Sequence, residues 1–371
     1  MNTALLSALI RDEGRRLGFF KVGFAPATVL PTAGKFRSCL AQGLHGETAY
    51  LERQAAKRED PRLVFPSARS VLVAAMNYRT GDILSDDPLK GRISRYAWGD
   101  DYHATLMARL KRLLEFIRNR DSSAEGLCYV DTGPVMEKVW GAQTAIGWMG
   151  KHTNLIARDQ GSWFFLGTIL LNLELEYDSK VKDFCGKCTR CMHACPTGAI
   201  VAPYILDSRL CISYLTIELR GPIPRHLRCL IGNRIYGCDD CQEVCPWNRF
   251  AVNTPEREFY PREGNFMPEL LSLITMSPVQ FSHQSKNSSM RRVKRDGFVR
   301  NVVVALGNSR RREAVPALGA ALQDNSPLVR SHAAWALGQI PDREAMNLLE
   351  SARRLETVTA VLEEIRLALE N

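Results

Sequence analysis

Hydrophobic residues follow two periods along the first half of the chain. Short apolar runs at 20–25 and 70–77 are typical of buried strands, whereas leucine and isoleucine recur every three or four positions over 105–118, as in an amphipathic helix. A further strand is expected at 127–130, followed by a turn at 131–134 and a helix from Val135 with Pro134 in its first turn. This alternation predicts an α/β domain over residues 1–175.

The pattern becomes helical and repeats near the C-terminal end. Residues 298–307, from Phe-Val-Arg-Asn to Ala-Leu-Gly, match residues 328–338, from Leu-Val-Arg-Ser to Ala-Leu-Gly. Helix pairs repeating at about 30 residues resemble HEAT repeats, so a HEAT-like α-helical module is predicted over 290–371. The looser stretch 253–289, which contains several prolines, is predicted to be a linker with one helix near 268–274.

Composition indicates an ordinary globular protein of two or three domains, with 371 residues, 45% hydrophobic and 24% charged. The most apolar run, 163–173, is interrupted by Gly167, Thr168 and Asn172 and falls short of the ~20 residues that cross a bilayer. The first residues lack the basic region of a signal peptide. We therefore expect a cytoplasmic protein with no membrane segment, and the domain layout is compatible with a monomer.

Positive charge is concentrated in one segment. The chain has a formal net charge of +9, and residues 286–312 hold nine basic side chains against Asp296, a local charge of +8. Such a patch predicts a polyanionic partner, with nucleic acid the first candidate, although a solvated surface would have the same composition.

Eight of the eleven cysteines lie between residues 185 and 245. The first run is Cys-x2-Cys-x2-Cys-x3-Cys-Pro over 185–196, and the second is Cys-x2-Cys-x3-Cys-Pro over 238–246, with Cys211 between them. Disulfides do not persist in a reducing compartment, so this clustering indicates metal. A structural zinc site is the alternative, but it would leave four cysteines without a role.

The spacing favours two 4Fe-4S clusters in a ferredoxin-like domain over 176–252. In two-cluster ferredoxins the fourth ligand of each cluster comes from the other motif. The first cluster then takes Cys185, Cys188, Cys191 and Cys245. The second takes Cys195, Cys238 and Cys241, and Cys211 supplies the missing ligand.

Familiar cofactor motifs are absent from the first domain. No G-x-G-x-x-G sequence follows a predicted strand, and His152 follows Gly150-Lys151 where a P-loop requires serine or threonine. Asp101-x-His103 lacks the glycine of the cobalt-ligand motif D-x-H-x-x-G, which indicates an ordinary surface or core histidine. Asp131 is the candidate acid, because it follows a strand where open α/β sheets place ligand sites; a turn or helix-cap aspartate is the alternative.

Several segments resemble the epoxyqueuosine reductase family. They are Cys-Ile-Ser-Tyr-Leu-Thr at 211–216, the run 231–242 containing Tyr-Gly-Cys-Asp-Asp-Cys-Gln, Cys-Pro-Trp-Asn at 245–248, Val-Asp-Thr-Gly-Pro at 130–134 and Ala-Ile-Gly-Trp-Met-Gly-Lys at 145–151. The order of parts also fits: an α/β domain, a double-cluster domain and a HEAT-like tail. The resemblance spans nearly the whole chain.

Membership of that family implies an oxidoreductase that reduces epoxyqueuosine to queuosine at the wobble position of tRNA anticodons, the last step of queuosine biosynthesis. It implies a cobalamin between the α/β and cluster domains, used as cob(I)alamin and fed with electrons by the two clusters, with Asp131 as general acid. For that role the pKa of Asp131 should be raised in a desolvated pocket. Positions in matching motifs imply cobalamin contacts from Arg58, Ser94, Lys151, Asn154, Ser213 and Arg234.

The same resemblance gives the basic segment a partner, tRNA carrying epoxyqueuosine. We expect phosphate contacts from Arg291, Arg292, Lys294, Arg295, Arg310, Arg311 and Arg312, together with the basic stretch 220–234. Two alternatives stay open. One is a cobalamin-dependent, dehalogenase-like reductase of a small molecule, and the other is a non-catalytic electron-transfer protein. The sequence does not identify the electron donor.

Overall fold

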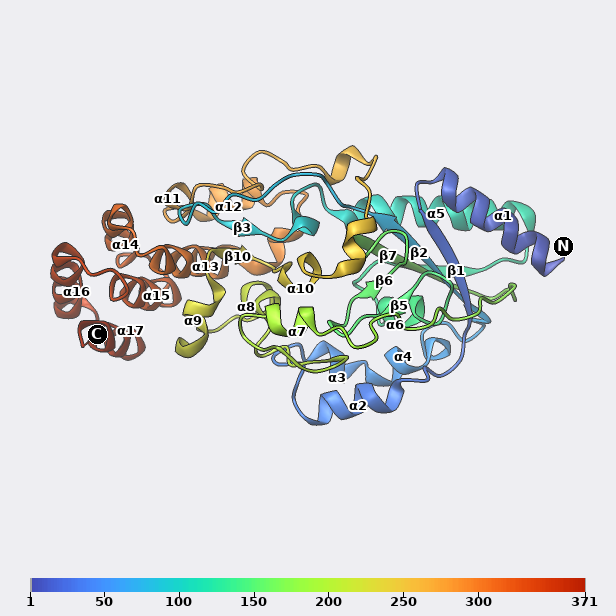
Figure 1. The fold of residues 1–371 in the computed structure, drawn as a ribbon, viewed down its shortest axis with the longest axis horizontal. Coiled ribbons are helices and arrows are strands. Elements are labelled where there is room, and N and C mark those ends of the chain that lie inside the picture. The colour runs from blue at the N-terminus through green and yellow to red at the C-terminus, as the bar shows by residue number, and fades with distance from the viewer. Residues whose placement is uncertain (1, 371) are drawn as a thin grey trace. The chain divides into compact units, whose positions relative to one another are not determined.

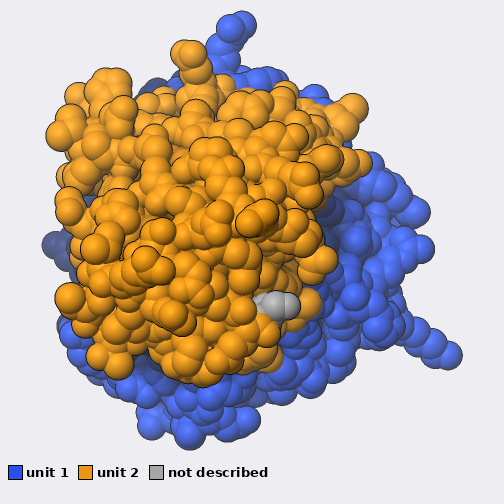
Figure 2. Space-filling model, turned by 90° about the vertical axis from the view of Figure 1, so that its left-hand side faces the viewer, with its two compact units in different colours: residues 1–81, 101–209, 240–260 blue, residues 82–100, 210–239, 261–371 orange. Residues whose placement is uncertain are grey.

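The computed structural model describes residues 2–370 and divides them into two compact units, coloured separately in Figure 2. Unit 1 comprises residues 1–81, 101–209 and 240–260, and unit 2 comprises 82–100, 210–239 and 261–371. Each unit is thus assembled from segments far apart in sequence. The predicted consecutive domains 1–175, 176–252, 253–289 and 290–371 stay a prediction, since the compact units interleave along the chain.

Unit 1 is built on a sheet of four strands in the order β1 (Lys21–Pro26), β2 (Ser70–Asn77), β7 (Phe164–Leu171) and β4 (Gly126–Tyr129) (Figure 1). The predicted strands at 20–25, 70–77 and 127–130 are therefore confirmed. Every neighbouring pair is antiparallel. Asp131 follows β4 as expected, but the rule for ligand sites of open α/β sheets does not apply to it, because that rule concerns parallel strands.

Helices cover both faces of this sheet, which explains why all eight residues of β2 are buried. Side chains alternate between faces along a strand. On one face a Cβ at Gly167 would lie 2.6 Å from Leu110 of α5 (Tyr102–Arg120), and one at Gly14 of α1 (Thr3–Arg16) would lie 2.4 Å from Val22 of β1. The other face packs Trp140 of α6 (Glu137–Gly141) into a core cluster with Val71 and Val73.

The helix predicted from Val135 begins two residues later and has five residues. Pro134 therefore precedes the helix and does not form its first turn, which corrects the expectation. The remaining elements of unit 1 are short: α2 (Ala33–Ala41), α3 (Tyr50–Arg53), α4 (Ala55–Glu59), β5 (Trp148–Met149), β6 (Leu155–Ile156), α7 (Arg190–Ala194), β8 (Ile200–Ala202), β9 (Ile205–Leu206) and α10 (Asp240–Glu243).

Unit 2 is mainly helical. Its small elements are β3 (Arg92–Ile93), which pairs in parallel with β10 (Arg234–Tyr236), and α8 (Ile212–Ile217), α9 (Arg225–Ile231), α11 (Leu270–Leu273) and α12 (Pro278–Gln284). The predicted helix near 268–274 is confirmed as α11. Helix α12, which begins at a capping box between Ser277 and Gln280, was not expected in the predicted linker.

The helical repeat is confirmed by α13 (Lys294–Ser309), α14 (Val315–Ala321), α15 (Pro327–Leu337) and α16 (Arg343–Leu355), followed by α17 (Thr359–Leu369) (Figure 1). The glycine that ends each repeated motif lies against the helix two along the chain, α15 for Gly307 and α17 for Gly338. A Cβ at Gly307 would come within 2.8 Å of Ala336 Cα, and one at Gly338 within 2.8 Å of Ala368 Cβ. A larger side chain at either position would therefore clash where consecutive repeats touch.

None of the helices in residues 2–370 combines the length and the apolar character needed to cross a membrane.

Candidate functional site

Four of the predicted cluster ligands gather in unit 1. Cys191 lies in α7, and Cys245 directly precedes a 3-10 turn at 246–250. Burial, together with the charges of Cys185, Cys191 and Cys188, raises the pKa of Cys245 to about 11, so these four thiols lie close enough to influence one another. Four cysteine thiols are the donor set that a 4Fe-4S cluster requires, and the assignment of these four to one cluster stays a prediction from spacing.

The loop that carries Cys185 and Cys188 is hydrogen-bonded to the side chain of Lys151. Lys151 donates from Nζ to the carbonyl oxygens of Gly186 at 2.7 Å and Cys188 at 3.0 Å. Aromatic rings close the site, with Trp148 lying 5.0 Å from Trp247 and 5.2 Å from Phe184 between ring centroids. Low polarity around the thiols is the environment that excludes water from a cluster.

The second predicted set is divided between the units. Cys195 and Cys241 belong to unit 1, and Cys211 and Cys238 to unit 2. Within unit 1, Cys195 Sγ accepts a hydrogen bond from the Ala199 amide at 3.3 Å, and Cys211 directly precedes α8 in unit 2. The assignment of these four ligands to one cluster stays a prediction from spacing.

Asp131 lies on a tight turn after β4. Its φ of 56° is in the left-handed region, and a Cβ at Gly133 would lie 2.1 Å from the ring of Tyr129, so only glycine fits there. The Asp131 side chain is 66% exposed. Tyr102 donates its hydroxyl to Asp131 Oδ2 at 3.0 Å, which fixes one face of the carboxylate.

His103 connects Asp131 to a second carboxylate. Its Nε2 lies 3.6 Å from Asp131 Oδ2, and its Nδ1 lies 2.6 Å from Asp101 Oδ1. Burial disfavours the charged imidazole, but the hydrogen bonds to Asp101 and Asp131 outweigh it and raise the pKa of His103 to about 9. At neutral pH the group is therefore an imidazolium between two carboxylates.

The pKa of Asp131 is lowered, chiefly by the hydrogen bond from His103 and then by Tyr102 and Lys138, although burial opposes the shift. The expected raised pKa is therefore wrong for this structure. His103 is a partly exposed histidine, as expected, and its Nε2 lies 3.6 Å from the candidate acid. The sequence signal for this pair is Asp101-x-His103, a carboxylate and an imidazole two positions apart at the start of a helix.

Glu137 is a further carboxyl group at this turn, and sequence reasoning missed it. Its Oε1 accepts the Asp131 backbone N–H at 2.7 Å. Burial raises the pKa of Glu137 to about 7, and the charge of Asp131 adds to the effect. Arg58 is 8% exposed, and its pKa is lowered by burial despite the opposing charges of Glu137 and Asp131. The charge of Asp131 thus acts on three neighbouring groups, His103, Glu137 and Arg58.

The six predicted cobalamin contacts fall into both units: Arg58, Lys151 and Asn154 into unit 1, and Ser94, Ser213 and Arg234 into unit 2. Several of these side chains form hydrogen bonds with other residues of the protein. Asn154 accepts from Lys138 at 2.7 Å, Ser94 donates to Asp239 at 2.5 Å, and Arg234 donates to the Ile231 carbonyl at 2.8 Å. In contrast, Arg58 Nε is buried and lacks a hydrogen-bond partner among the described residues.

The basic segment of unit 2 contains exposed side chains, of which Arg292 and Arg312 also form ion pairs, and two internal arginines, Arg295 and Arg300. Arg291, Lys294, Arg310 and Arg311 are exposed. Three others form ion pairs within the unit: Arg292 with Glu218, Arg295 with Asp324, and Arg312 with Asp342. Arg300, counted in the basic segment, is fully buried. Its guanidinium donates to the carbonyl oxygens of Leu215, Leu219 and Gly221.

Comparison with known proteins matches three parts of the chain to family descriptions. Residues 58–132 match "Epoxyqueuosine reductase QueG, DUF1730", residues 184–248 match "4Fe-4S double cluster binding domain", and residues 298–370 match "HEAT repeats". The epoxyqueuosine reductase of Salmonella typhimurium LT2 is 40% identical, over 93% of this chain and 91% of that protein. The chain belongs to the epoxyqueuosine reductase family.

Other members of the family are similar over nearly their whole length. The Shewanella oneidensis epoxyqueuosine reductase is 40% identical over 98% of this chain and 95% of its own. A crystal structure of epoxyqueuosine reductase with an epoxyqueuosine-modified tRNA-Tyr stem loop has a TM-score of 0.93 at 30% identity, covering 100% of this chain and 99% of that chain. A Bacillus subtilis epoxyqueuosine reductase, described with its aspartate catalytic loop swung out of the active site, has a TM-score of 0.92 at 29% identity, covering 100% and 99%.

Proposed function

We propose that this protein reduces epoxyqueuosine to queuosine in tRNA. The observation that carries the proposal is the exposed aspartate of the β4 turn, hydrogen-bonded to Tyr102 and facing His103, in the same unit as four converging cysteines. Removing an epoxide oxygen to leave an alkene takes two electrons and two protons. The cluster ligands supply the means to deliver single electrons, and the Asp131 turn supplies the protons.

Proton delivery involves His103 as well as Asp131. Because Asp131 ionises readily in this structure, the proton near the carboxylate at neutral pH is held on the imidazolium. We assign Asp131 Oδ2 as the atom that presents the proton to the epoxide oxygen and His103 Nε2 as the group that replenishes it. Asp101 positions the imidazole by accepting from Nδ1. Tyr102 holds Asp131 in orientation.

Arg58 supports a bound cobalamin in this family member. A buried guanidinium nitrogen without a partner requires a polar ligand atom, and the amide groups around a corrin ring supply such acceptors. Cobalamin would supply a strongly nucleophilic, low-valent cobalt centre for the reduction. Asn154 accepts from Lys138, whose charge acts on Asp131, and Lys151 donates to the cluster loop, so both are proposed as further contacts. Ser94, Ser213 and Arg234 are proposed from the second unit.

The exposed residues of the basic segment are proposed to bind tRNA phosphates. Arg291, Lys294, Arg310 and Arg311 keep their charge toward solvent. We also propose phosphate contacts from Arg292, Arg295 and Arg312. To bind a phosphate, each of them would have to leave the carboxylate with which it is now paired.

A cell-based experiment tests the activity. Cells without their own epoxyqueuosine reductase accumulate epoxyqueuosine in tRNA, and expression of this chain should restore queuosine. The Asp131→Asn variant, expressed at the same level, should leave epoxyqueuosine in place. A failure of the unmodified chain to restore queuosine while the purified protein reduces a halogenated small molecule would replace the proposal with the dehalogenase-like alternative.

A further inference from the structure

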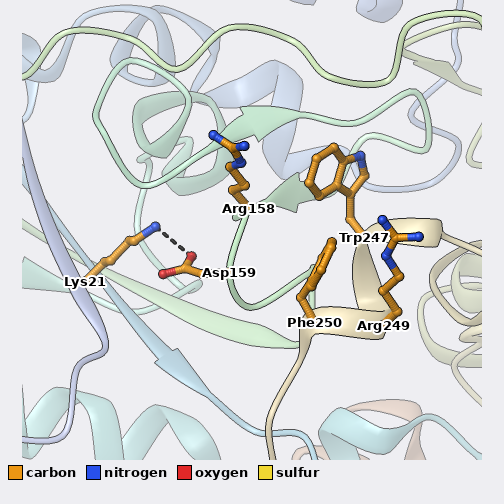
Figure 3. Close-up of a pocket in the computed structure, with 6 residues that line it drawn as sticks. All are labelled: Lys21, Arg158, Asp159, Trp247, Arg249 and Phe250. Carbon is orange, nitrogen blue, oxygen red and sulfur yellow. Dashed lines mark hydrogen bonds and ion pairs between the residues drawn. The ribbon is translucent and has the colours of Figure 1, made fainter.

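A surface cavity of about 630 Å³ lies in unit 1. Lys21 and Asp159 approach it from one side, Trp247, Arg249 and Phe250 form the other, and Arg158 lies between them (Figure 3). The proton-delivery turn contributes none of these residues. The cavity is therefore separate from the proton-delivery groups assigned above.

The aromatic wall of this cavity leads directly to the first cluster site. Trp247 follows Cys245 by two positions and belongs to the same hydrophobic cluster as Cys245 and Cys185. Its ring lies 5.8 Å from Phe250 on the cavity side and 5.8 Å from Phe184, which precedes Cys185. A molecule seated in the cavity would thus be separated from the cluster ligands by a single layer of rings.

The rim of the cavity is positive. Lys21 is paired with Asp159 at 2.7 Å, so their charges cancel, whereas Arg158 and Arg249 add two positive charges. Both arginines are exposed and lie over aromatic rings, Arg158 at 5.6 Å from Phe184 and Arg249 at 4.6 Å from Phe250. Stacking orders each guanidinium without neutralising its charge.

We propose that this cavity is the docking site for a small, acidic electron-carrier protein and that the cluster of Cys185, Cys188, Cys191 and Cys245 accepts its electrons. The rim attracts an acidic partner, and the aromatic wall receives the edge of a redox group exposed on that partner, such as a reduced flavin. In each encounter the carrier is oxidised by one electron and the cluster is reduced by one, with no bond formed and no proton moved. Two encounters supply the electron pair of the proposed function, on which this inference rests.

The position of the cavity favours a carrier over a nucleic acid. Phosphates would also suit the arginines, but a binding site for phosphate does not need a wall of rings continuous with cluster ligands. Electron-transfer encounters are small and transient, so a single cavity with a charged rim is sufficient.

Reduction kinetics test the proposal. The reconstituted protein is mixed with an acidic flavodoxin in its hydroquinone state, and cluster reduction is followed by stopped-flow absorbance. The double variant Arg158→Glu, Arg249→Glu should lower the second-order rate by about ten-fold at low salt, and the difference should shrink as salt increases. Binding of oxidised flavodoxin to the unreconstituted protein, followed by fluorescence anisotropy, should weaken in parallel. Reduction by dithionite should be unchanged.

A matched control reverses two exposed arginines of α5 outside the cavity, Arg112→Glu and Arg120→Glu. Equal flavodoxin rates for both double variants would overturn the proposal. It would also be overturned if the cavity variant loses binding to a tRNA stem loop while flavodoxin reduces it normally. If flavodoxin reduction depends on the cavity but neither flavodoxin nor dithionite supports epoxyqueuosine reduction, the docking site stands and the proposed function fails.

Discussion

The Asp131 turn and the helical repeat use charged side chains in opposite ways. In the repeat, Arg300 is fully buried and donates to three backbone carbonyl groups, so its charge satisfies the fold. At the turn, Asp131 is 66% exposed on a left-handed residue, and its neighbours His103 and Glu137 have pKa values raised to about 9 and about 7. A buried arginine whose hydrogen bonds are all made stabilises the fold. Side chains whose pKa values lie near neutral pH can instead exchange protons.

The largest effect on activity is expected at Asp131. The Asp131→Asn variant should lose at least about a hundred-fold in the rate of epoxyqueuosine reduction, because an amide cannot donate a proton as an acid does. Its melting temperature should stay close to that of the unmodified protein, since the side chain is exposed. Single-turnover kinetics and thermal unfolding of the same preparation check both statements; an equal rate would remove Asp131 from the reaction.

Substitutions in the helical repeat should instead change the stability of the protein. Gly307→Ala places a methyl group 2.8 Å from Ala336 Cα and should lower the free energy of unfolding by about 2 kcal/mol. Gly34→Ala, in α2, is the matched control, because a Cβ there meets nothing within 4 Å. Denaturant unfolding monitors both variants. An equal stability of the two would contradict the close helix packing.

Exposed and buried arginines of the basic segment should respond differently to substitution. Replacing Arg310, Arg311 and Arg312 by alanine should reduce the salt dependence of tRNA binding, by about one unit of log–log slope for each phosphate that the variant no longer neutralises. Arg300→Met should instead destabilise the protein, because it leaves buried carbonyls without donors. Binding isotherms at several salt concentrations provide the test. An unchanged slope in the triple variant would refute the tRNA placement.

The smallest predicted effect is on the pH dependence of stability. Folding raises the pKa of His103 from 6.5 to about 9, so the stabilisation is fully present below about pH 6.5 and is lost as pH rises through 9. His103→Gln should flatten the stability profile in that window, and the rate of reduction should fall less steeply toward pH 9. Chemical unfolding between pH 6 and 10 measures the first effect. A profile with the same slope in both proteins would contradict the ion pair of His103 with Asp101 and Asp131.

Sequence patterns predicted the elements that depend on local periodicity. Strands at 70–77 and helices at 105–118 and 298–307 follow from residue spacing alone, and so do the proposed cysteine ligands, whose motif is local. The antiparallel strand order did not follow, since it depends on pairing between β2 and β7, whose residues are about ninety positions apart. The contact between His103 and Asp131 was missed for a similar reason: it requires the left-handed turn that follows β4 to lie beside the start of α5.

The most direct measurement is mass spectrometry of nucleosides from a tRNA stem loop carrying epoxyqueuosine. The protein is reconstituted anaerobically to about eight irons per chain, as two 4Fe-4S clusters require, loaded with cobalamin and supplied with reductant. The account predicts that epoxyqueuosine is converted to a nucleoside lacking one oxygen atom, queuosine. A fully loaded protein that binds the stem loop and leaves epoxyqueuosine unchanged would contradict it.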